Sequence, residues 1–549
     1  MKLRSLPAIL FLALFFFYPL ARILTLTFDP KLLLDQTVLR TTQHVTLFTF
    51  YQASLSTFFT FLLGLPAAYL FARFDFRGKS LLRAITAIPF LLPTVVVAAG
   101  FNALLGPRGW FSLLFPFSSF IFHPSSFALI LLAHVFYNTT IVIRIVGNAL
   151  TNLDPRLEQA ARTLGADSPR VWWNVTLPVL RAPLLAAGLL VFLFDFTSFG
   201  VILLLGGGQF STLEVEIYIQ ALHLLNLPAA ALLSLIQLLC TLAFSILYSR
   251  TVTHHLISTA PRPAATRRPK TIPEKIYTAS FIFLLSSFFI LPLLAIPFRS
   301  LARLEADRGE RAAVQYGLTS DYYSELFVNR RDSIFYVPPM DAARNSLVYA
   351  GATVLLSLAL GLPLASALAR PGRIEKILDP LLMLPLGASA ITLGLGFIVT
   401  FNQPLITGHW SLLTSPLVIP IAHTIIALPF VVRALQPAMA SIPERLRHAA
   451  SSLGASPFRV WQTVDWPILS RAALAAATFA FTVSLGEFGA ATLLARPDFP
   501  TLPVAIARFL SQPGGLNYGQ AMAMSTILMS VTLAGILLIE KVRPASGEF

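Results

Sequence analysis

Long runs of hydrophobic residues, each about as long as a membrane-spanning helix, alternate with short polar connectors along this chain. A helix needs about 20 apolar residues to cross the hydrocarbon core of a bilayer. The pattern predicts an all-α integral membrane protein with about twelve transmembrane helices, the first of them an uncleaved span rather than a secretory signal. The runs cover residues 6–28, 47–72, 84–105, 126–149, 179–205, 229–248, 276–298, 345–369, 380–402, 415–439, 468–494 and 519–540.

The composition excludes the ordinary soluble classes. Of the 549 residues, 56% are hydrophobic and 12% are charged, whereas a soluble domain carries about 25% charged residues. The same apolar content excludes a disordered chain. The single cysteine, Cys240, excludes a disulfide framework and a cysteine-built metal site. We expect neither a bound metal nor another cofactor.

Positive charge gathers in alternate connectors. The net charge of +15 comes from residues that flank the apolar runs, which indicates membrane orientation rather than nucleic-acid binding. Connectors 73–83, 156–170 and 250–275 are basic, while 206–228 and 403–414 contain no Lys or Arg. The positive-inside rule places the basic connectors and both termini in the cytoplasm.

One connector departs from this charge pattern. Residues 299–342 fall on the predicted outer side but contain several arginines, accompanied by acidic residues. They are Arg299, Arg303, Arg308, Arg311, Arg330 and Arg331.

The chain contains an internal repeat. A shift of 289 residues carries segment 164–172 onto 453–461, where Leu-Gly-Ala and Arg-Val-Trp recur at the same places. The polar stretch 251–275 contains four prolines and predicts a cytoplasmic linker between two halves of six helices, 1–250 and 276–549. An even number of spans separates equivalent helices, so the halves have the same orientation and form a parallel repeat.

The densest part of the repeat lies in two predicted cytoplasmic loops, 154–178 and 441–467. Each predicts a short helix that ends at a glycine in the left-handed conformation. Adjacent alanines give each helix a small face that another surface can approach closely. The alanines and the glycine stops are Ala160, Ala161 and Gly165 in the first loop and Ala449, Ala450 and Gly454 in the second.

The two loop helices are predicted to begin differently. Asp154 is expected to cap the first helix, with Pro155 at its first position. Ser441 and Glu444 have the spacing of a capping box, in which each side chain bonds the other's backbone N–H.

These loops resemble the EAA signature of permease subunits of type I, binding-protein-dependent ABC importers. Glu158 stands at the head of the first copy, and Arg447 replaces that glutamate in the second. The resemblance implies a MetI-like permease fold and a role for each loop helix in coupling to an ATPase. The coupling residues it implies are Glu158, Ala160, Ala161, Gly165, Arg447, Ala449, Ala450 and Gly454.

The resemblance also implies the partners. An ABC ATPase homodimer would bind the two loops, and an extracytoplasmic substrate-binding protein would deliver the substrate, at the inner membrane of a prokaryote. The fused two-half form resembles the thiamine and ferric-iron permeases.

The chain has no ATP site of its own: Gly78-Lys79-Ser80 lacks the upstream glycine of a P-loop and follows a predicted membrane span rather than a strand. We therefore expect a translocation subunit rather than an enzyme, with no catalytic residues.

Carboxylates inside predicted spans mark a candidate substrate path, because charges in the bilayer usually face a cavity or a partner. The 289-residue shift pairs Asp195 with Ser484 and Ser198 with Glu487, so each half has one carboxylate and one serine in exchanged positions. Alternatively, each carboxylate only bonds a neighbouring helix or caps a helix break. The candidate path residues are Asp195, Thr197, Ser198, Thr482, Ser484 and Glu487.

Other polar residues in the spans are expected to be structural. We interpret His134 and His423 as buried hydrogen-bonding residues, and Arg144 and Arg433 as side chains that reach toward the membrane surface.

The substrate remains open between alternatives. Segment 204–222 resembles thiamine-type permeases in its Gly-Gly-Gly, Thr-Leu-Glu and Glu-Ile-Tyr elements, which favours thiamine over ferric iron. An alternative of another class is a twelve-span secondary transporter that uses Asp195 and Glu487 as an ion relay, although it gives no reason for the repeated loops. A non-transporting scaffold would not explain the intramembrane carboxylates.

Overall fold

A computed structural model describes residues 5–28, 35–111, 125–253, 266–304, 317–328, 338–369, 372–402 and 411–542. These residues are almost entirely helical, which confirms the predicted all-α class. Two short strands, β1 (Ala302–Arg303) and β2 (Gly317–Leu318), pair antiparallel, with Ala302 opposite Leu318.

Nine single helices among the described residues are long and apolar enough to cross a membrane. They are the helix made of α1 (Leu6–Leu12) and α2 (Tyr18–Thr27), α4 (Gln36–Arg73), α8 (Ser126–Thr151), α11 (Leu177–Phe196) with the turns before it, α14 (Leu227–Thr253), α15 (Ile272–Ser300), α17 (Pro339–Leu368), α20 (Val418–Ala440), and α23 (Trp466–Gly486) with the turns before it. The predicted run 519–540 falls in α26 (Gly515–Val542).

Two predicted spans are broken helices. The run 84–105 divides into Lys79–Leu91 and Thr94–Leu105, which meet at 111°. Leu92 is extended at the break, with φ −78° and ψ 146°, because the following Pro93 disfavours helical backbone there. The run 380–402 likewise divides into α18 (Arg373–Leu382) and α19 (Ala390–Phe401), with a 3-10 turn between them.

The predicted runs 179–205 and 468–494 also end earlier than expected. Helices α11 and α23 stop at Phe196 and Gly486, and short separate helices follow. The same offset of 289 residues relates the elements on both sides of each break. The short helices of these regions are α9 (Pro155–Thr163), α10 (Ser168–Val171), α12 (Gly200–Leu205) and α13 (Leu213–Tyr218), and α21 (Glu444–Ser452), α22 (Pro457–Val460), α24 (Gly489–Leu494) and α25 (Leu502–Ser511).

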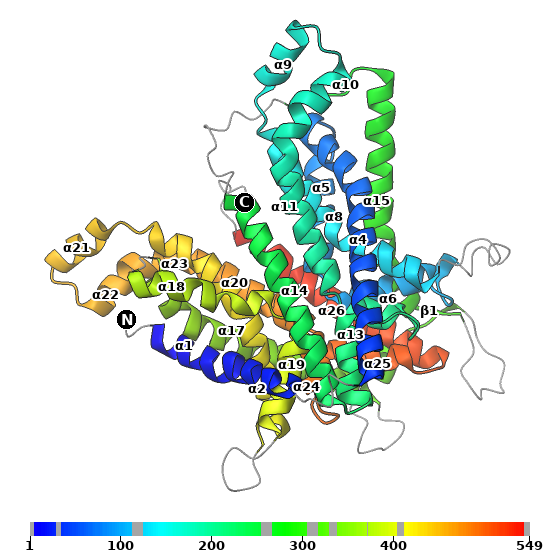
Figure 1. The fold of residues 1–549 in the computed structure, drawn as a ribbon, viewed down its shortest axis with the longest axis vertical. Coiled ribbons are helices and arrows are strands. Elements are labelled where there is room, and N and C mark those ends of the chain that lie inside the picture. The colour runs from blue at the N-terminus through cyan, green and yellow to red at the C-terminus, as the bar shows by residue number, and fades with distance from the viewer. Residues whose placement is uncertain are drawn as a thin grey trace.

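The ribbon has two bundles that meet near α13, α19, α24 and α25 and diverge toward α9 and α21 (Figure 1). The first helix of each predicted half crosses to the other half: α2 packs against α19 and α14, and α15 packs against α6 (Thr94–Leu105) and α26. Glycines allow both approaches, since a Cβ on Gly100 would lie 2.7 Å from the Pro292 carbonyl oxygen and one on Gly396 would lie 2.9 Å from Cβ of Pro19. The crossing interlocks the two halves.

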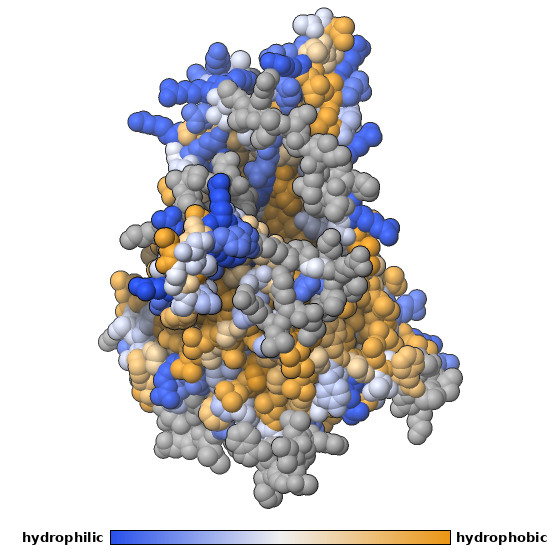
Figure 2. Space-filling view, turned by 90° about the vertical axis from the view of Figure 1, so that its left-hand side faces the viewer, coloured by the Kyte–Doolittle hydropathy of each residue, from blue (hydrophilic) through white to orange (hydrophobic). Residues whose placement is uncertain are grey.

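The surface has the character of a membrane protein. Hydrophobic side chains cover the lower body of the face in Figure 2, and hydrophilic ones gather toward the end that carries α9. Apolar side chains on the spans are widely exposed, among them Phe283 at 75% and Leu355 at 72%. A soluble monomer would not present so much apolar surface to water.

The predicted outer connector contains a buried arginine. Arg299 is 1% exposed; its guanidinium donates to the Ala302 carbonyl oxygen over 2.7 Å and lies 5.0 Å from the centre of the Tyr518 ring. This charge belongs to the packing and so carries no weight against the predicted orientation. The short helix α16 (Asp321–Ser324) follows β2, and Arg308, Arg311, Arg330 and Arg331 lie outside the described residues.

Candidate functional site

The first loop helix, α9, has the predicted start and stop. Oδ1 of Asp154 accepts the Arg156 N–H over 2.9 Å. Gly165 has φ +87°, and its N–H donates to the Arg162 carbonyl while the Ala166 N–H donates to that of Ala161, both over 3.0 Å. This pair of bonds is the Schellman motif.

The second loop helix, α21, ends in the same way. Gly454 has φ +83°, its N–H donates to the Ser451 carbonyl, and the Ala455 N–H donates to that of Ala450. The predicted capping box at its start is wrong. Pro443 occupies the capping position and offers no side-chain bond, and the Ser441 hydroxyl instead donates to the Ala438 carbonyl at the end of α20 over 2.8 Å.

Both loop helices project away from the body of the protein. No residue of α9 or α21 is buried. A leucine beside each glycine stop is almost fully exposed, Leu164 at 89% and Leu453 at 88%. The repeat thus places one large exposed apolar side chain at the end of each loop helix. The sequence analysis did not single them out, although their recurrence at the 289-residue offset was a visible signal.

Glu158 and Arg447 anchor their helices with opposite charge. Glu158 forms an ion pair with Arg73 at the end of α4 and accepts the Thr176 hydroxyl over 3.1 Å. Arg447 donates from Nε to Oδ1 of Asp465 over 2.7 Å. Asp465 is the equivalent of Thr176, so both loops tie the signature position to the π-helical turn that follows. This explains how an arginine can replace the glutamate.

The end of the linker lies against the same region. The Arg267 N–H donates to the Arg73 carbonyl over 3.1 Å, and the Asp75 N–H donates to the Arg267 carbonyl over 2.9 Å. The Arg267 guanidinium pairs with Glu274. Nearby, Nζ of Lys79 donates to the Phe74 carbonyl over 2.7 Å, so the Gly-Lys-Ser sequence begins a helix in which the lysine is bound to backbone.

Asp195 lies at the end of α11, fully buried. Its Oδ1 accepts an N–H of the Asn138 side chain over 2.7 Å. The backbone carbonyl of Asp195 accepts an N–H of the Gln52 side chain, also over 2.7 Å. Among the described residues, no donor meets Oδ2. A buried carboxylate oxygen without a donor is costly unless a ligand or water supplies one.

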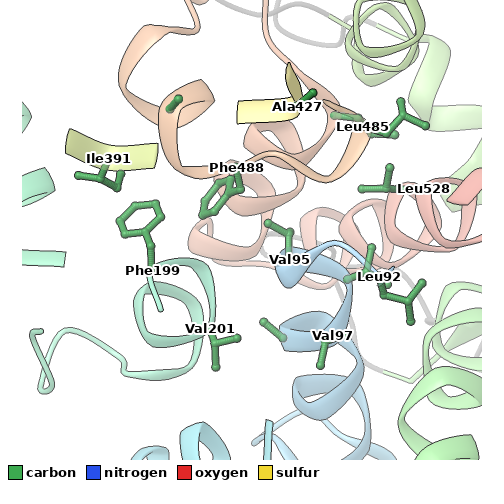
Figure 3. Packing of buried hydrophobic residues seen from close by; sticks show 14 of the residues in the cluster. Leu92, Val95, Val97, Phe199, Val201, Ile391, Ala427, Leu485, Phe488 and Leu528 are labelled. Atoms are coloured by element: carbon green, nitrogen blue, oxygen red, sulfur yellow. The ribbon is translucent and has the colours of Figure 1, made fainter. Parts of the chain in front are cut away.

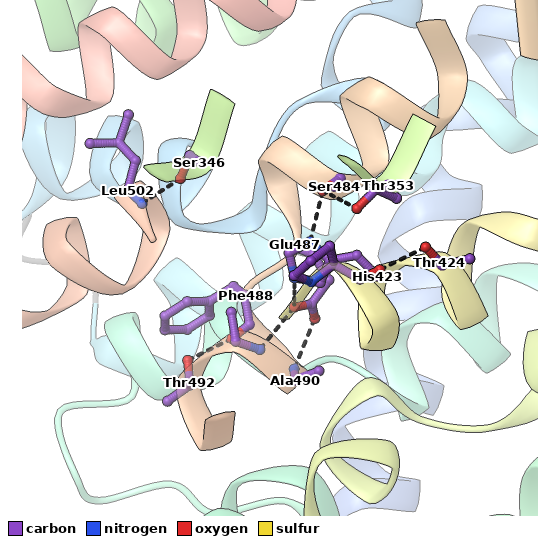
Figure 4. Close-up of polar contacts among 12 residues, drawn as sticks. Ser346, Thr353, His423, Thr424, Ser484, Glu487, Phe488, Ala490, Thr492 and Leu502 are labelled. Atoms are coloured by element: carbon purple, nitrogen blue, oxygen red, sulfur yellow. Dashed lines mark hydrogen bonds and ion pairs between the residues drawn. The ribbon is translucent and has the colours of Figure 1, made fainter. Parts of the chain in front are cut away.

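Glu487 lies at the equivalent break after α23. Its two oxygens accept the N–H groups of Ala490 and Ala491, each over 2.9 Å (Figure 4). The carboxylate therefore caps α24, where its negative charge meets the positive end of the helix. Glu487 therefore does cap a helix break, which was the alternative to a place on the substrate path.

A histidine accompanies each carboxylate, bonded as expected for buried polar residues. Nε2 of His134 lies 2.8 Å from the Ser198 hydroxyl, and Nδ1 lies 3.0 Å from that of Ser56 and 3.5 Å from Oδ1 of Asp195. In the second half, Nδ1 of His423 lies 2.7 Å from the Ser484 hydroxyl and Nε2 lies 3.2 Å from Oε2 of Glu487 (Figure 4). The exchanged carboxylate and serine thus occupy opposite sides of equivalent imidazole rings.

A cavity of about 360 Å³ lies between elements of the two halves. Of the predicted path residues, Asp195, Thr197, Ser198 and Glu487 line it. Thr482 and Ser484 are not among its lining residues: the Thr482 hydroxyl donates to the Thr478 carbonyl of its own helix, and the Ser484 hydroxyl donates to that of Thr353.

The cavity also contains residues that the sequence analysis missed. Phe199 and Phe488, equivalent in the repeat, stack with ring centres 5.4 Å apart and planes at 28° (Figure 3). Glu214 of α13 is 2% exposed and accepts the Ser389 hydroxyl of the second half over 2.6 Å and an N–H of Gln237. Glu214 lies outside the apolar runs, so the search for charges within spans did not reach it.

Comparison with known proteins finds similarity to transport permeases, in agreement with the resemblance of the two loops. Residues 60–251 match the family described as the binding-protein-dependent transport system inner membrane component. The chain is 29% identical to the thiamine transport system permease protein of Brucella abortus (strain 2308), over 91% of this chain and 88% of that protein. It is 27% identical to that of Escherichia coli (strain K12), over 86% and 85%, and 26% identical to a probable ABC transporter permease protein of Sinorhizobium fredii, over 90% and 86%.

Proposed function

We propose that the chain is a fused permease subunit of a binding-protein-dependent ABC importer and that it carries thiamine across the inner membrane along a path between its two halves. The similarity to importer permeases favours this class over an ion-coupled secondary transporter. The single observation that carries the substrate proposal is the similarity to thiamine permeases over about nine-tenths of the chain.

The chemistry of the cavity supports a cationic substrate. Asp195, Glu214 and Glu487 all border it, and thiamine carries a permanent positive charge on its thiazolium ring. Ferric iron is the alternative cation and would need several oxygen or nitrogen ligands close together. Within the described ranges, no three His, Cys, Asp or Glu side chains form such a group.

The partners and orientation form part of the proposal. Each subunit of one ATPase homodimer docks on one loop helix, and a substrate-binding protein docks on the opposite side of the membrane. Both termini lie in the cytoplasm with the loops. Residues 1–250 and 276–549 form the two halves, joined by the linker 251–275, and α9 and α21 transmit ATPase closure to the path.

The substrate assignment is tested by reconstitution in lipid vesicles with the cognate ATPase and binding protein. We expect the thiamine-loaded binding protein to stimulate ATP hydrolysis several-fold over the unloaded protein, with thiamine accumulating in the lumen. Stimulation by the iron-loaded binding protein and none by the thiamine-loaded one would reverse the assignment.

The docking of the ATPase is tested at the exposed leucines. Replacing Leu164 and Leu453 by aspartate puts charge where an apolar contact is proposed, and burying it costs several kcal/mol. We expect the double variant to lose capture of the ATPase in pull-down from detergent. Leu318→Asp is the matched control, because Leu318 is 92% exposed on β2, away from both loops. Equal capture of the ATPase by the unaltered permease, the double variant and the Leu318→Asp control would contradict the docking surface.

A further inference from the structure

The cavity between the halves is lined by three carboxylates, and the only basic residue type beside them among the described residues is histidine. Asp195, Glu214 and Glu487 line it, and no Lys or Arg does so in the part of the chain that the structure describes. The donors to Glu214 are a hydroxyl and an amide, both neutral. Buried carboxylates are normally paired with a cation or fully hydrogen-bonded, and Oδ2 of Asp195 has no donor among the described residues.

Aromatic rings form another part of the wall. Phe199 and Phe488 follow the breaks after α11 and α23, and their stacked rings meet between the two halves (Figure 3). Tyr218 of α13 does not line the cavity, but it packs nearly edge-on against the Phe199 ring, with centres 5.6 Å apart. A cation within about 6 Å of such a ring face is attracted to it, most strongly where water is excluded. Flat ligands add stacking contact.

The cavity is not symmetric, although its aromatic pair is. The position equivalent to Glu214 is Pro503 in α25, so only the first half supplies this carboxylate. Glu214 reaches the second half through the Ser389 hydroxyl at the start of α19. A ligand with one charged end can therefore be held in a single orientation, with the charge toward the first half and its flat body against the rings.

We infer that this cavity is a binding site for a flat aromatic monocation, which places its charge near Glu214 and Asp195 and its ring against Phe199 and Phe488. The inference rests on the proposed function in assigning the cavity to the substrate path, and it adds the residues that select the substrate there. The volume of about 360 Å³ lies within the range of small-molecule sites, roughly 300–1,000 Å³.

The test measures binding to the permease–ATPase complex in nanodiscs, without binding protein or nucleotide. The probes are radiolabelled thiamine and its neutral tricyclic derivative thiochrome. Sodium chloride is tested as a competitor of thiamine, and N-methylglucamine chloride, whose cation is larger, is the control for ionic strength. We expect saturable thiamine binding, at least tenfold weaker binding of thiochrome, and no displacement by sodium beyond that of the larger cation.

Three substitutions locate the site. Glu214→Gln should weaken thiamine binding at least tenfold, and Phe199→Leu and Phe488→Leu at least threefold each. The matched control for charge is Glu216→Gln, since Glu216 lies two residues along α13 with partners Ser211 and Gln220 and does not line the cavity. The control for ring loss is Phe481→Leu on α23, also outside the lining. Both controls should bind as the unaltered protein does.

The outcomes separate this inference from the proposed function. If the binding protein delivers thiamine for normal uptake but the isolated complex binds none, the site is refuted and the function stands. If the complex binds 1-methylnicotinamide, a flat pyridinium cation, while thiamine-loaded binding protein stimulates nothing, the thiamine assignment fails and the site stands. Equal binding by E214Q and E216Q, or full displacement by sodium, would refute the aromatic-cation site. Should E214Q fail to assemble, Glu214→Asp must retain binding, because it keeps the charge.

Discussion

Valine at positions 165 and 454 should leave basal ATP hydrolysis intact while substrate-stimulated hydrolysis and uptake fall about 5- to 30-fold. Both glycines have left-handed backbone, with φ +87° and +83°. That conformation costs an L-residue roughly 1–2 kcal/mol, which corresponds to a factor of about 5–30 in an equilibrium. The strain acts on the backbone alone, because a Cβ at either position would meet nothing within 4 Å.

Two controls separate this strain from a general loss of folding. Asparagine tolerates the left-handed region, so Gly165→Asn with Gly454→Asn should retain most of the stimulation. Gly78 has φ +81° and equally open space at the start of α5 (Lys79–Ala87), so Gly78→Val imposes the same strain outside the loops. Normal stimulated hydrolysis and uptake in the valine variant would show that the helix stops have no part in coupling.

Neutralising the carboxylates at the two helix breaks should reduce uptake of a cationic substrate at least tenfold. The change is Asp195→Asn with Glu487→Gln, measured as thiamine uptake by the reconstituted complex. Tenfold corresponds to about 1.4 kcal/mol, which is modest for two charges bordering one buried cavity. The amide side chains keep the size of the originals, and their oxygens can still accept the bonds from Asn138 and Ala490, whereas the amide nitrogen at position 487 cannot accept the bond from Ala491.

Assembly with the ATPase is the control for this variant, because a structural role alone would disturb assembly before uptake. We expect co-purification of the ATPase at the level of the unaltered permease. Uptake at the normal rate would mean that Asp195 and Glu487 only hold the helix breaks together, and the path would have to be sought elsewhere.

Features that depend on a few neighbouring residues were predictable from the sequence. The Asp154 cap and the two glycine stops follow from local backbone chemistry. Asp154 caps the start of α9, and Gly165 and Gly454 follow the ends of α9 and α21, as predicted. The capping box at Ser441 and Glu444 failed because Pro443, between them, takes the capping position. The breaks in 84–105 and 380–402 were missed because hydropathy measures apolar content and is insensitive to a backbone bend.

The order of residues was enough to predict the class of this protein, because apolar runs indicate a membrane and the repeat of Arg, Trp and Gly indicates two related halves with two related loops. Which polar groups share a cavity could be seen only in the folded chain. Glu214 and Ser389, 175 positions apart, meet across the halves, while Thr482 faces its own helix. The reason is physical: helical propensity and hydropathy depend on neighbouring residues in the chain, whereas a cavity is formed by side chains that only packing brings together.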